Sequence, residues 1–249
     1  MTSTIAIGDD ELTDAAARLE GGDPAATLAW AAERFAPRLA LASSFGPEDC
    51  VLIDVIGRHR LAIEVFTLDT GLFFDETTAL WRALEARYGI TVRAFRPRQT
   101  VDEQAAAHGP ALWERQPDAC CKLRKVEPLG RALSGLDAWV TGIRRDQTPD
   151  RATAKVVERD RRPGLIKLNP LAAWTSDDVW AYVRAHDVPV NPMHARGFPS
   201  IGCTPCTSPV AAGEDPRSGR WRGNAKTECG LHVEDGRLVP GRLVREVGS

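Results

Sequence analysis

Four of the six cysteines in this 249-residue chain form two pairs, and their spacing predicts a metal centre. Cys120 and Cys121 are adjacent, whereas Cys203 and Cys206 form a CxxC motif. Taken alone, a CxxC motif is typical of a structural or redox pair, and two adjacent cysteines are typical of small buried side chains. Together, four thiolates from two distant segments can complete one tetrahedral metal site or one iron–sulfur cubane. The spacing does not distinguish zinc from iron–sulfur.

Cys229 stands apart from both pairs and is a candidate nucleophile. It lies in the segment ECGLH at 228–232, with Lys226 before it and His232 after it. Nearby cations lower the pKa of a thiol, which is about 8.5 in free cysteine, and so raise the reactive thiolate fraction. The alternative is a surface cysteine without a chemical role. The remaining cysteine, Cys50, is expected to be buried on a helix.

Basic side chains close to these cysteines predict a small anionic substrate. Lys125 follows the first pair, Arg144 follows an apolar run, and Arg217 and Arg220 precede Cys229. The planar guanidinium group suits phosphate and sulfate oxygens. The formal net charge is −2, so the chain as a whole is not expected to bind a polyanion. The alternative is a set of solvated loop side chains.

A short polar loop at 43–46 follows the first apolar run and opens a helix. The free backbone N–H groups of a helix start favour anions. The loop, which contains Ser43, Ser44 and Gly46, lacks the lysine and the spacing of a Walker A motif, so ordinary ATPase chemistry is not predicted. Taken alone, the pattern is weak.

Alternating apolar and amphipathic segments indicate the elements that position these residues. Strands are expected at 39–44, 63–68, 91–95, 138–141 and 165–168, and helices at 12–35 (broken near Gly21), 48–56, 75–88, 101–108 and from the first cysteine pair to about 133. This alternation predicts an α/β fold with a mainly parallel sheet flanked by helices. Ligands bind beyond the carboxyl ends of such strands, here at 43–46, 68–71 and 141–145.

The whole chain, 1–249, is expected to be one α/β domain with a loop-rich C-terminal segment at about 190–249. That segment is rich in Gly, Pro and Arg, and it carries the CxxC motif and Cys229. The N-terminus has no signal-peptide pattern, and no apolar run reaches the roughly 18 residues needed to span a bilayer. A cytoplasmic protein with reduced cysteines is therefore expected.

Five segments together resemble the assimilatory adenylyl-sulfate reductase family. They are CCKLRKVEPL at 120–129, TGIRRDQ at 141–147, IGCTPCT at 201–207, RSGRW at 217–221 and ECGLH at 228–232. The resemblance covers roughly residues 35–232, and the combination is specific although the single pieces are not. It implies an adenine-nucleotide α-hydrolase-like fold, related to ATP pyrophosphatases.

The resemblance also implies roles for individual residues. One 4Fe-4S cluster per chain would be held by the two cysteine pairs, and Cys229 would be the nucleophile. Two further groups would contact the substrate: Lys125, Arg217, Arg220 and His232 at the phosphosulfate, and Ser43, Ser44, Gly46, Leu68 and Arg144 around the adenosine.

The implied reaction reduces adenosine 5′-phosphosulfate to sulfite and AMP, as part of sulfate assimilation and cysteine biosynthesis. The Cys229 thiolate would attack the sulfur, and AMP would leave an enzyme S-sulfocysteine. Thioredoxin would then release sulfite by a step that resembles thiol–disulfide exchange. The cluster would act structurally and electrostatically, through Lys125.

Two alternatives remain. The first is phosphoadenylyl-sulfate reductase activity on the same fold, although family enzymes with that preference usually lack the cysteine pairs. The second is a zinc-stabilised nucleic-acid-binding module, which the near-neutral charge and the isolated Cys229 disfavour. The sequence does not say which serine of the first loop contacts the substrate. It assigns no role to residues 233–249. It is also compatible with a homo-oligomer.

Overall fold

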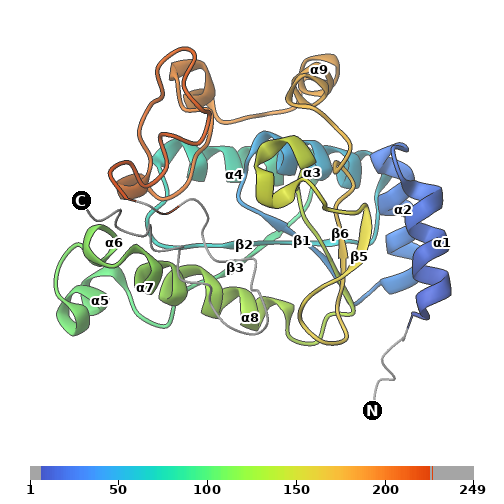
Figure 1. Ribbon diagram of the computed structural model, residues 1–249, viewed down its shortest axis with the longest axis horizontal. Helices are drawn as coiled ribbons and strands as arrows, with labels where there is room; N and C mark the ends of the chain where they lie inside the picture. The colour runs from blue at the N-terminus through green and yellow to red at the C-terminus, as the bar shows by residue number, and fades with distance from the viewer. Residues whose placement is uncertain (1–6, 225, 227–249) are drawn as a thin grey trace, which may run out of the picture.

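The computed structural model describes residues 7–224 and 226, and these residues form a six-stranded sheet between layers of helices (Figure 1). The strands, in chain order, are β1 (Leu39–Ser43), β2 (Glu64–Leu68), β3 (Val92–Phe95), β4 (Ala138–Val140), β5 (Val157–Arg159) and β6 (Ile166–Leu168). Their order in the sheet is β3-β2-β1-β4-β6-β5. All neighbouring strands are parallel except β5, which is antiparallel to β6. The prediction of a mainly parallel α/β fold is confirmed.

Helices cover both faces of this sheet (Figure 1). They are α1 (Asp9–Leu19), α2 (Pro24–Phe35), α3 (Pro47–His59), α4 (Asp75–Tyr88), α5 (Val101–His108), α6 (Leu112–Arg115), α7 (Pro117–Cys121), α8 (Glu127–Leu133) and α9 (Ser176–His186). Short 3-10 helices are η2 (Arg145–Gln147), η3 (Pro149–Arg151), η4 (Pro192–Arg196) and η5 (Thr204–Cys206), and η1 (Lys122–Val126) is a π-helix.

Two apolar clusters correspond to the two faces. The larger contains buried side chains of α2, α3, α4 and α9 together with Leu41 and Val65 of the sheet. The smaller packs Leu129 and Leu133 of α8 against Phe66 and Trp139. Burial of apolar surface on both faces explains why the central strands are continuous apolar runs.

The chain after Val188 has no strand longer than a single bridge within the described residues, and it packs on α4 and on the loop between β2 and α4. The backbone N–H and the hydroxyl of Thr204 both donate to the Leu72 carbonyl, at 2.8 and 3.1 Å. Asn191 Nδ2 donates to Thr77 Oγ1 at 3.0 Å. Figure 1 shows this part, orange to red, as a lobe beside α4.

The first of these contacts brings the CxxC motif to the carboxyl end of β2. No helix within the described ranges is long and apolar enough to cross a membrane.

Candidate functional site

One pocket brings the two cysteine pairs together. Cys120 and Cys121 come from α7, Cys203 directly precedes η5, and Cys206 ends it. The other lining residues are Leu72, Trp113, Pro117, Arg124, Lys125 and Trp221. Three of the thiols are buried and that of Cys206 is half-buried. The four predicted metal ligands are therefore neighbours, although more than 80 residues separate the pairs in the sequence.

The helical segment after Cys120 places cations on the face that carries the cysteines. Arg124 follows Cys120 by four residues, and Lys125 follows Cys121 by four, a spacing that puts side chains on one helix face. Both cations lie in the π-helix η1, which is closed by a hydrogen bond from Glu127 N–H to the Lys122 carbonyl. Such wide turns occur frequently at functional sites.

The environment of the thiols favours ligation over free ionisation. Burial raises the pKa of Cys120, against a smaller lowering by its hydrogen bond from Gln104. Burial also raises the pKa of Cys206 to about 11, whereas Lys125 lowers it. Thiols with raised pKa values stay protonated at neutral pH unless a metal displaces the proton.

Unpaired donors line the same pocket. Arg124 is 2% exposed, and its Nη1 donates to the Thr70 carbonyl at 2.7 Å, but its Nε has no hydrogen-bond partner among the described residues. Trp113 Nε1 is also buried, and no residue in the described part of the chain accepts from it. Two further polar groups contact the sulfurs: Gln104 Nε2 donates to Cys120 Sγ at 3.8 Å, and Cys203 Sγ lies 3.4 Å from Thr70 Oγ1.

This donor set fits an anionic, thiolate-ligated cluster. Donors around the sulfurs stabilise the negative charge that four thiolates bring. Within the described residues, no three His, Cys, Asp or Glu side chains converge on a single ion position.

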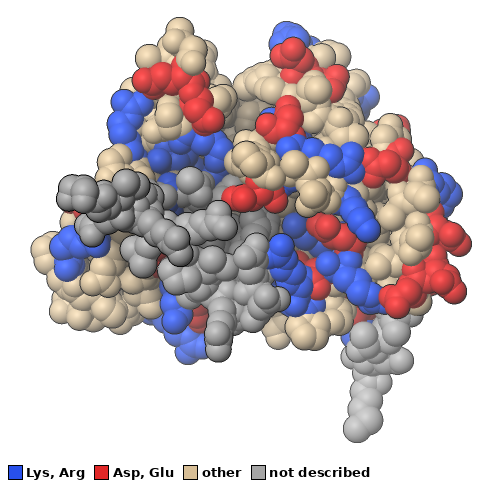
Figure 2. Space-filling model, viewed as in Figure 1, with Lys and Arg blue, Asp and Glu red and all other residues tan. Residues whose placement is uncertain are grey.

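Arg220 is buried next to this pocket. Its Nη1 donates to Ser200 Oγ and to the Ile201 carbonyl, both at 3.3 Å, and its guanidinium lies 4.6 Å from the ring centroid of Trp221. Its positive charge lowers the pKa of Cys206, although less than Lys125 does. Arg217, three residues earlier, is half-buried. Figure 2 shows basic side chains in the hollow between the C-terminal lobe and the part of the molecule that carries α9.

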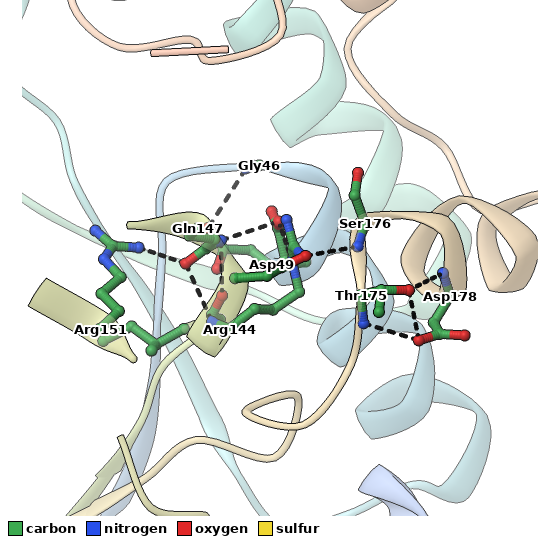
Figure 3. A network of polar contacts seen from close by, with 12 residues as sticks. Gly46, Asp49, Arg144, Gln147, Arg151, Thr175, Ser176 and Asp178 are labelled. Carbon is green, nitrogen blue, oxygen red and sulfur yellow. Dashed lines mark hydrogen bonds and ion pairs between the residues drawn. The ribbon is translucent and has the colours of Figure 1, made fainter. Parts of the chain in front are cut away.

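The loop after β1 is organised around Asp49 (Figure 3). Asp49 Oδ2 accepts from the Ser44 N–H at 2.7 Å, the Ser44 hydroxyl at 3.0 Å and the Gly46 N–H at 3.4 Å. Burial raises the pKa of Asp49 to about 6. Two N–H groups expected to be free for an anion are thus occupied by a carboxylate of the chain itself. Ser43 is buried, and Ser44 is the exposed serine of the loop.

Arg144 joins the loop after β4 to the start of α3 (Figure 3). Its Nε donates to Glu48 Oε1 at 2.9 Å, and its Nη1 pairs with Asp146. Gln147 Nε2 also donates to Glu48 Oε1, at 3.0 Å. Because two carboxylates neutralise this buried guanidinium, Arg144 holds the two loops together.

The loop between β2 and α4 connects the two halves of the site. Leu68 ends β2, half-buried, on the face that packs against α8. Thr70 contacts both Cys203 and Arg124, while the Phe73 ring packs edge-on against Phe45 with centroids 6.3 Å apart. The loop between β2 and α4 therefore contacts both the cysteine pocket and the loop after β1.

Cys229 and His232 lie outside the described residues. Lys226, three residues before Cys229, is described, and its Nζ pairs with Asp118 of α7. Thr70 lies in the ligand segment predicted at 68–71, and Trp221 ends the motif RSGRW. Gln104 and Asp118 also contact the site but were not predicted from the sequence. Asp118 carried a usable signal, because it lies two residues before Cys120.

Comparison with known proteins identifies the family. Residues 38–209 match the phosphoadenosine phosphosulfate reductase domain family. Among curated relatives, "Phosphoadenosine 5'-phosphosulfate reductase" of Gloeobacter violaceus is 49% identical, covering 92% of this chain and 97% of its own length. Two relatives named "Adenosine 5'-phosphosulfate reductase" are each 44% identical to this chain. The one from Halalkalibacterium halodurans covers 93% of this chain and 100% of its own length. The one from Mycolicibacterium smegmatis covers 94% of this chain and 100% of its own length.

Solved structures agree with this comparison. The phosphoadenylyl-sulfate reductase of Candida auris superimposes with a TM-score of 0.74 at 31% identity, covering 84% of this chain and all of that one. FMN adenylyltransferase of Candida glabrata shares the fold, with a TM-score of 0.55 at 17% identity, covering 82% of this chain and 67% of that one. The fold and the sequence thus lead to one conclusion: the chain belongs to the phosphoadenosine phosphosulfate reductase family.

Proposed function

We propose that this protein reduces adenosine 5′-phosphosulfate to sulfite and AMP in sulfate assimilation. The observation that carries the proposal is the pocket in which both cysteine pairs meet beside Arg124 and Lys125. The names of the relatives from Halalkalibacterium halodurans and Mycolicibacterium smegmatis support the same substrate.

The two cysteine pairs would hold one 4Fe-4S cluster. When bound, the cluster supplies a fixed charged centre and ties α7 to the segment around η5. Buried N–H donors of Arg124 and Trp113, which are unpaired within the described ranges, suit its sulfurs, as do the side chains of Gln104 and Thr70.

The nucleophile would be the Cys229 thiolate. It attacks the sulfur of the sulfuryl group, the bond from that sulfur to the bridging phosphate oxygen breaks, and AMP leaves. The product is S-sulfocysteine at residue 229. One thiolate of reduced thioredoxin then attacks Cys229 Sγ and displaces sulfite. The second thiol resolves the mixed disulfide, so the dithiol supplies both electrons.

Cations would stabilise the charge that grows on phosphate and sulfuryl oxygens in the transition state. Lys125, Arg217, Arg220 and His232 are the residues proposed for this role. The charge of Arg144 is already balanced by Glu48 and Asp146, which suits a position beside the adenosine rather than the phosphosulfate. Ser43, Ser44, Gly46 and Leu68 are proposed to lie around the adenosine as well.

The alternative substrate is the 3′-phosphorylated nucleotide, phosphoadenylyl sulfate, for which the Gloeobacter violaceus relative is named. Comparing kcat/KM for the two nucleotides decides between them. We expect strong preference for adenosine 5′-phosphosulfate; equal or reversed values would assign the other substrate.

The role of Cys229 is tested by trapping the intermediate. Mixing enzyme and substrate without reductant should add one SO3 group to the peptide that contains Cys229, and reduced thioredoxin should remove it. Cys229→Ser should abolish both adduct and sulfite, whereas Cys50→Ala, at a buried cysteine of the core, should retain them. An adduct on another cysteine would contradict the mechanism.

The cluster is tested by composition. Anaerobically purified protein should contain about four iron and four sulfide per chain. Cys203→Ser should lose most of this iron, while Cys229→Ser should keep it. Stoichiometric zinc without iron would rule the cluster out.

A further inference from the structure

Lys226 is the last residue that the structure describes before Cys229, and its side chain is held against the cysteine site. Its Nζ forms an ion pair with Asp118 and lies 5.5 Å from the ring centroid of Trp221. Only 7% of the Lys226 side chain is exposed. Lysines are almost never buried unless paired, so this contact fixes a residue that would otherwise extend into solvent.

Trp221 connects this lysine to the second cysteine pair. Its backbone N–H donates to the Cys206 carbonyl at 3.1 Å, and its side chain lines the cysteine pocket. Its φ is +48°, a conformation that is rare for a bulky residue and persists only where the surroundings enforce it. The Arg220 guanidinium lies against the same ring. Trp221 is therefore a fixed platform for Lys226.

Asp118 connects the same lysine to the first cysteine pair. It lies in α7, two residues before Cys120. The ion pair with Lys226 thus spans 108 residues of sequence and joins α7 to the start of the tail.

We propose that Asp118, Trp221 and Lys226 form a clamp that positions the tail for attack by Cys229. The chain leaves Lys226 with only two residues before Cys229, so fixing Lys226 restricts the volume available to the nucleophile. Restricting a reacting group in this way raises its effective concentration at the substrate. Asp118 and Lys226 are positioning residues, and the inference rests on the proposed role of Cys229.

Trypsin cleavage tests the clamp without any measurement of activity. Trypsin must take the lysine side chain into its own pocket before it cuts after Lys226, and the clamp prevents this. Cleavage after Arg222, whose side chain is 54% exposed, provides an internal reference. In Asp118→Asn we expect cleavage after Lys226, relative to Arg222, to rise about tenfold. Asp118→Glu should restore the wild-type ratio.

Kinetics test the positioning role. Asp118→Asn should lower kcat about tenfold and change KM much less, because three of the four proposed phosphosulfate contacts, Lys125, Arg217 and Arg220, lie outside the tail. Formation of the SO3 adduct in a single turnover should slow by the same factor. Visible absorbance should be unchanged, which separates this effect from loss of the cluster. The matched control is Asp102→Asn, an exposed acid in the first turn of α5 that forms no ion pair among the described residues.

An unchanged cleavage ratio in Asp118→Asn would show that there is no clamp. A raised ratio with unchanged kcat would show that the clamp does not position Cys229; either result overturns the inference. If the wild-type protein forms no sulfite at all, the proposed function has failed, and the cleavage ratio still reports on the clamp by itself.

Discussion

Gly202 shows how a single residue fixes a cation beside the cysteine pocket. A Cβ at this position would lie 2.2 Å from Arg220 Nη2 and 2.5 Å from Cζ, closer than real contacts allow. Arg220 is buried under Trp221 and hydrogen-bonded to Ser200, so it has little room to move aside. Glycine at 202 is therefore what lets the guanidinium lie next to the CxxC segment.

We expect Gly202→Ala to lower kcat/KM at least about tenfold, which corresponds to about 1.4 kcal/mol, because Arg220 must leave its position. Gly130→Ala is the matched control. Gly130 lies in α8, and a methyl group there would meet nothing within 4 Å, so alanine should raise stability by about 0.5–1 kcal/mol and leave kinetics unchanged. Steady-state kinetics and urea unfolding check both. Similar kinetics in the two variants would show that Gly202 is not required.

Asp49→Asn should change how stability depends on pH. The pKa of buried Asp49 is raised from 3.8 to about 6, so the folded state holds this proton more tightly than the unfolded chain does. The wild type therefore loses stability as pH rises from about 4 to about 6, by up to about 3 kcal/mol. Asn cannot ionise, so its stability relative to the wild type should increase across this interval.

Urea unfolding at several pH values measures that difference. Asp178→Asn is the control with opposite sign, because hydrogen bonds from Thr175 lower the pKa of the exposed Asp178 carboxyl. There the wild type should gain stability relative to the variant as pH rises through the acidic range. Parallel pH profiles for wild type and Asp49→Asn would contradict the assigned ionisation.

At the scale of elements, three helices meet at one buried carboxylate. Asp54 of α3 is 1% exposed and accepts from Tyr88 of α4 at 2.9 Å and Tyr182 of α9 at 2.7 Å. Arg58 Nη1 lies 3.6 Å from the same carboxylate. These contacts hold α4 and α9 against α3, which begins at the loop after β1.

Tyr182→Phe should destabilise the protein by about 1.5–3 kcal/mol, the usual contribution of a hydrogen bond to a charged group. Tyr88→Phe should give a similar loss. The double variant should lose more than the sum, because it removes both tyrosine hydrogen bonds and leaves the Asp54 carboxylate buried. Urea unfolding of the four proteins measures this coupling, and strict additivity would show that the two bonds are independent.

The five parallel strands could be predicted from their apolar runs, each within about two residues of its observed bounds. β5 could not, since Val157 is its one apolar residue and pairing with β6 decides its conformation. α9 was also missed, although Thr175 and Asp178 form a capping box at its start. The cysteine pairs were identifiable by spacing, whereas contacts made by Gln104 depend on tertiary packing.

At the scale of the whole molecule, the C-terminal lobe contacts the α/β body mainly at α4 and at the loop that precedes it. Besides the Thr204 and Asn191 contacts, Arg196 of η4 pairs with Glu76 of α4. The cysteine pocket is a further junction, because its ligands come from both parts. A bound cluster would therefore link the lobe to the body as well as serve the reaction.

Removing iron with a chelator should lower Tm and expose the lobe to trypsin, because binding energy of the native metal site contributes to folding. Cleavage after Arg217 and Arg222 should increase, while sites in α1 and α2 should be affected less. Calorimetry and mass-mapped proteolysis follow both changes. Reconstitution with iron and sulfide should reverse them, and an unchanged Tm would mean that the cluster does not hold the lobe.

The joint at Asp54 also gives the protein an internal optical reporter. The chain contains two tyrosines, and both are engaged there. Burial, reinforced by the neighbouring carboxylate, raises the pKa of each phenol above its ordinary value. An alkaline titration should therefore show no phenolate absorbance at the pH where free tyrosine ionises. The phenolate absorbance of both tyrosines should appear in a single step when the three helices separate. Ultraviolet absorbance alone would then report whether α3, α4 and α9 remain packed together.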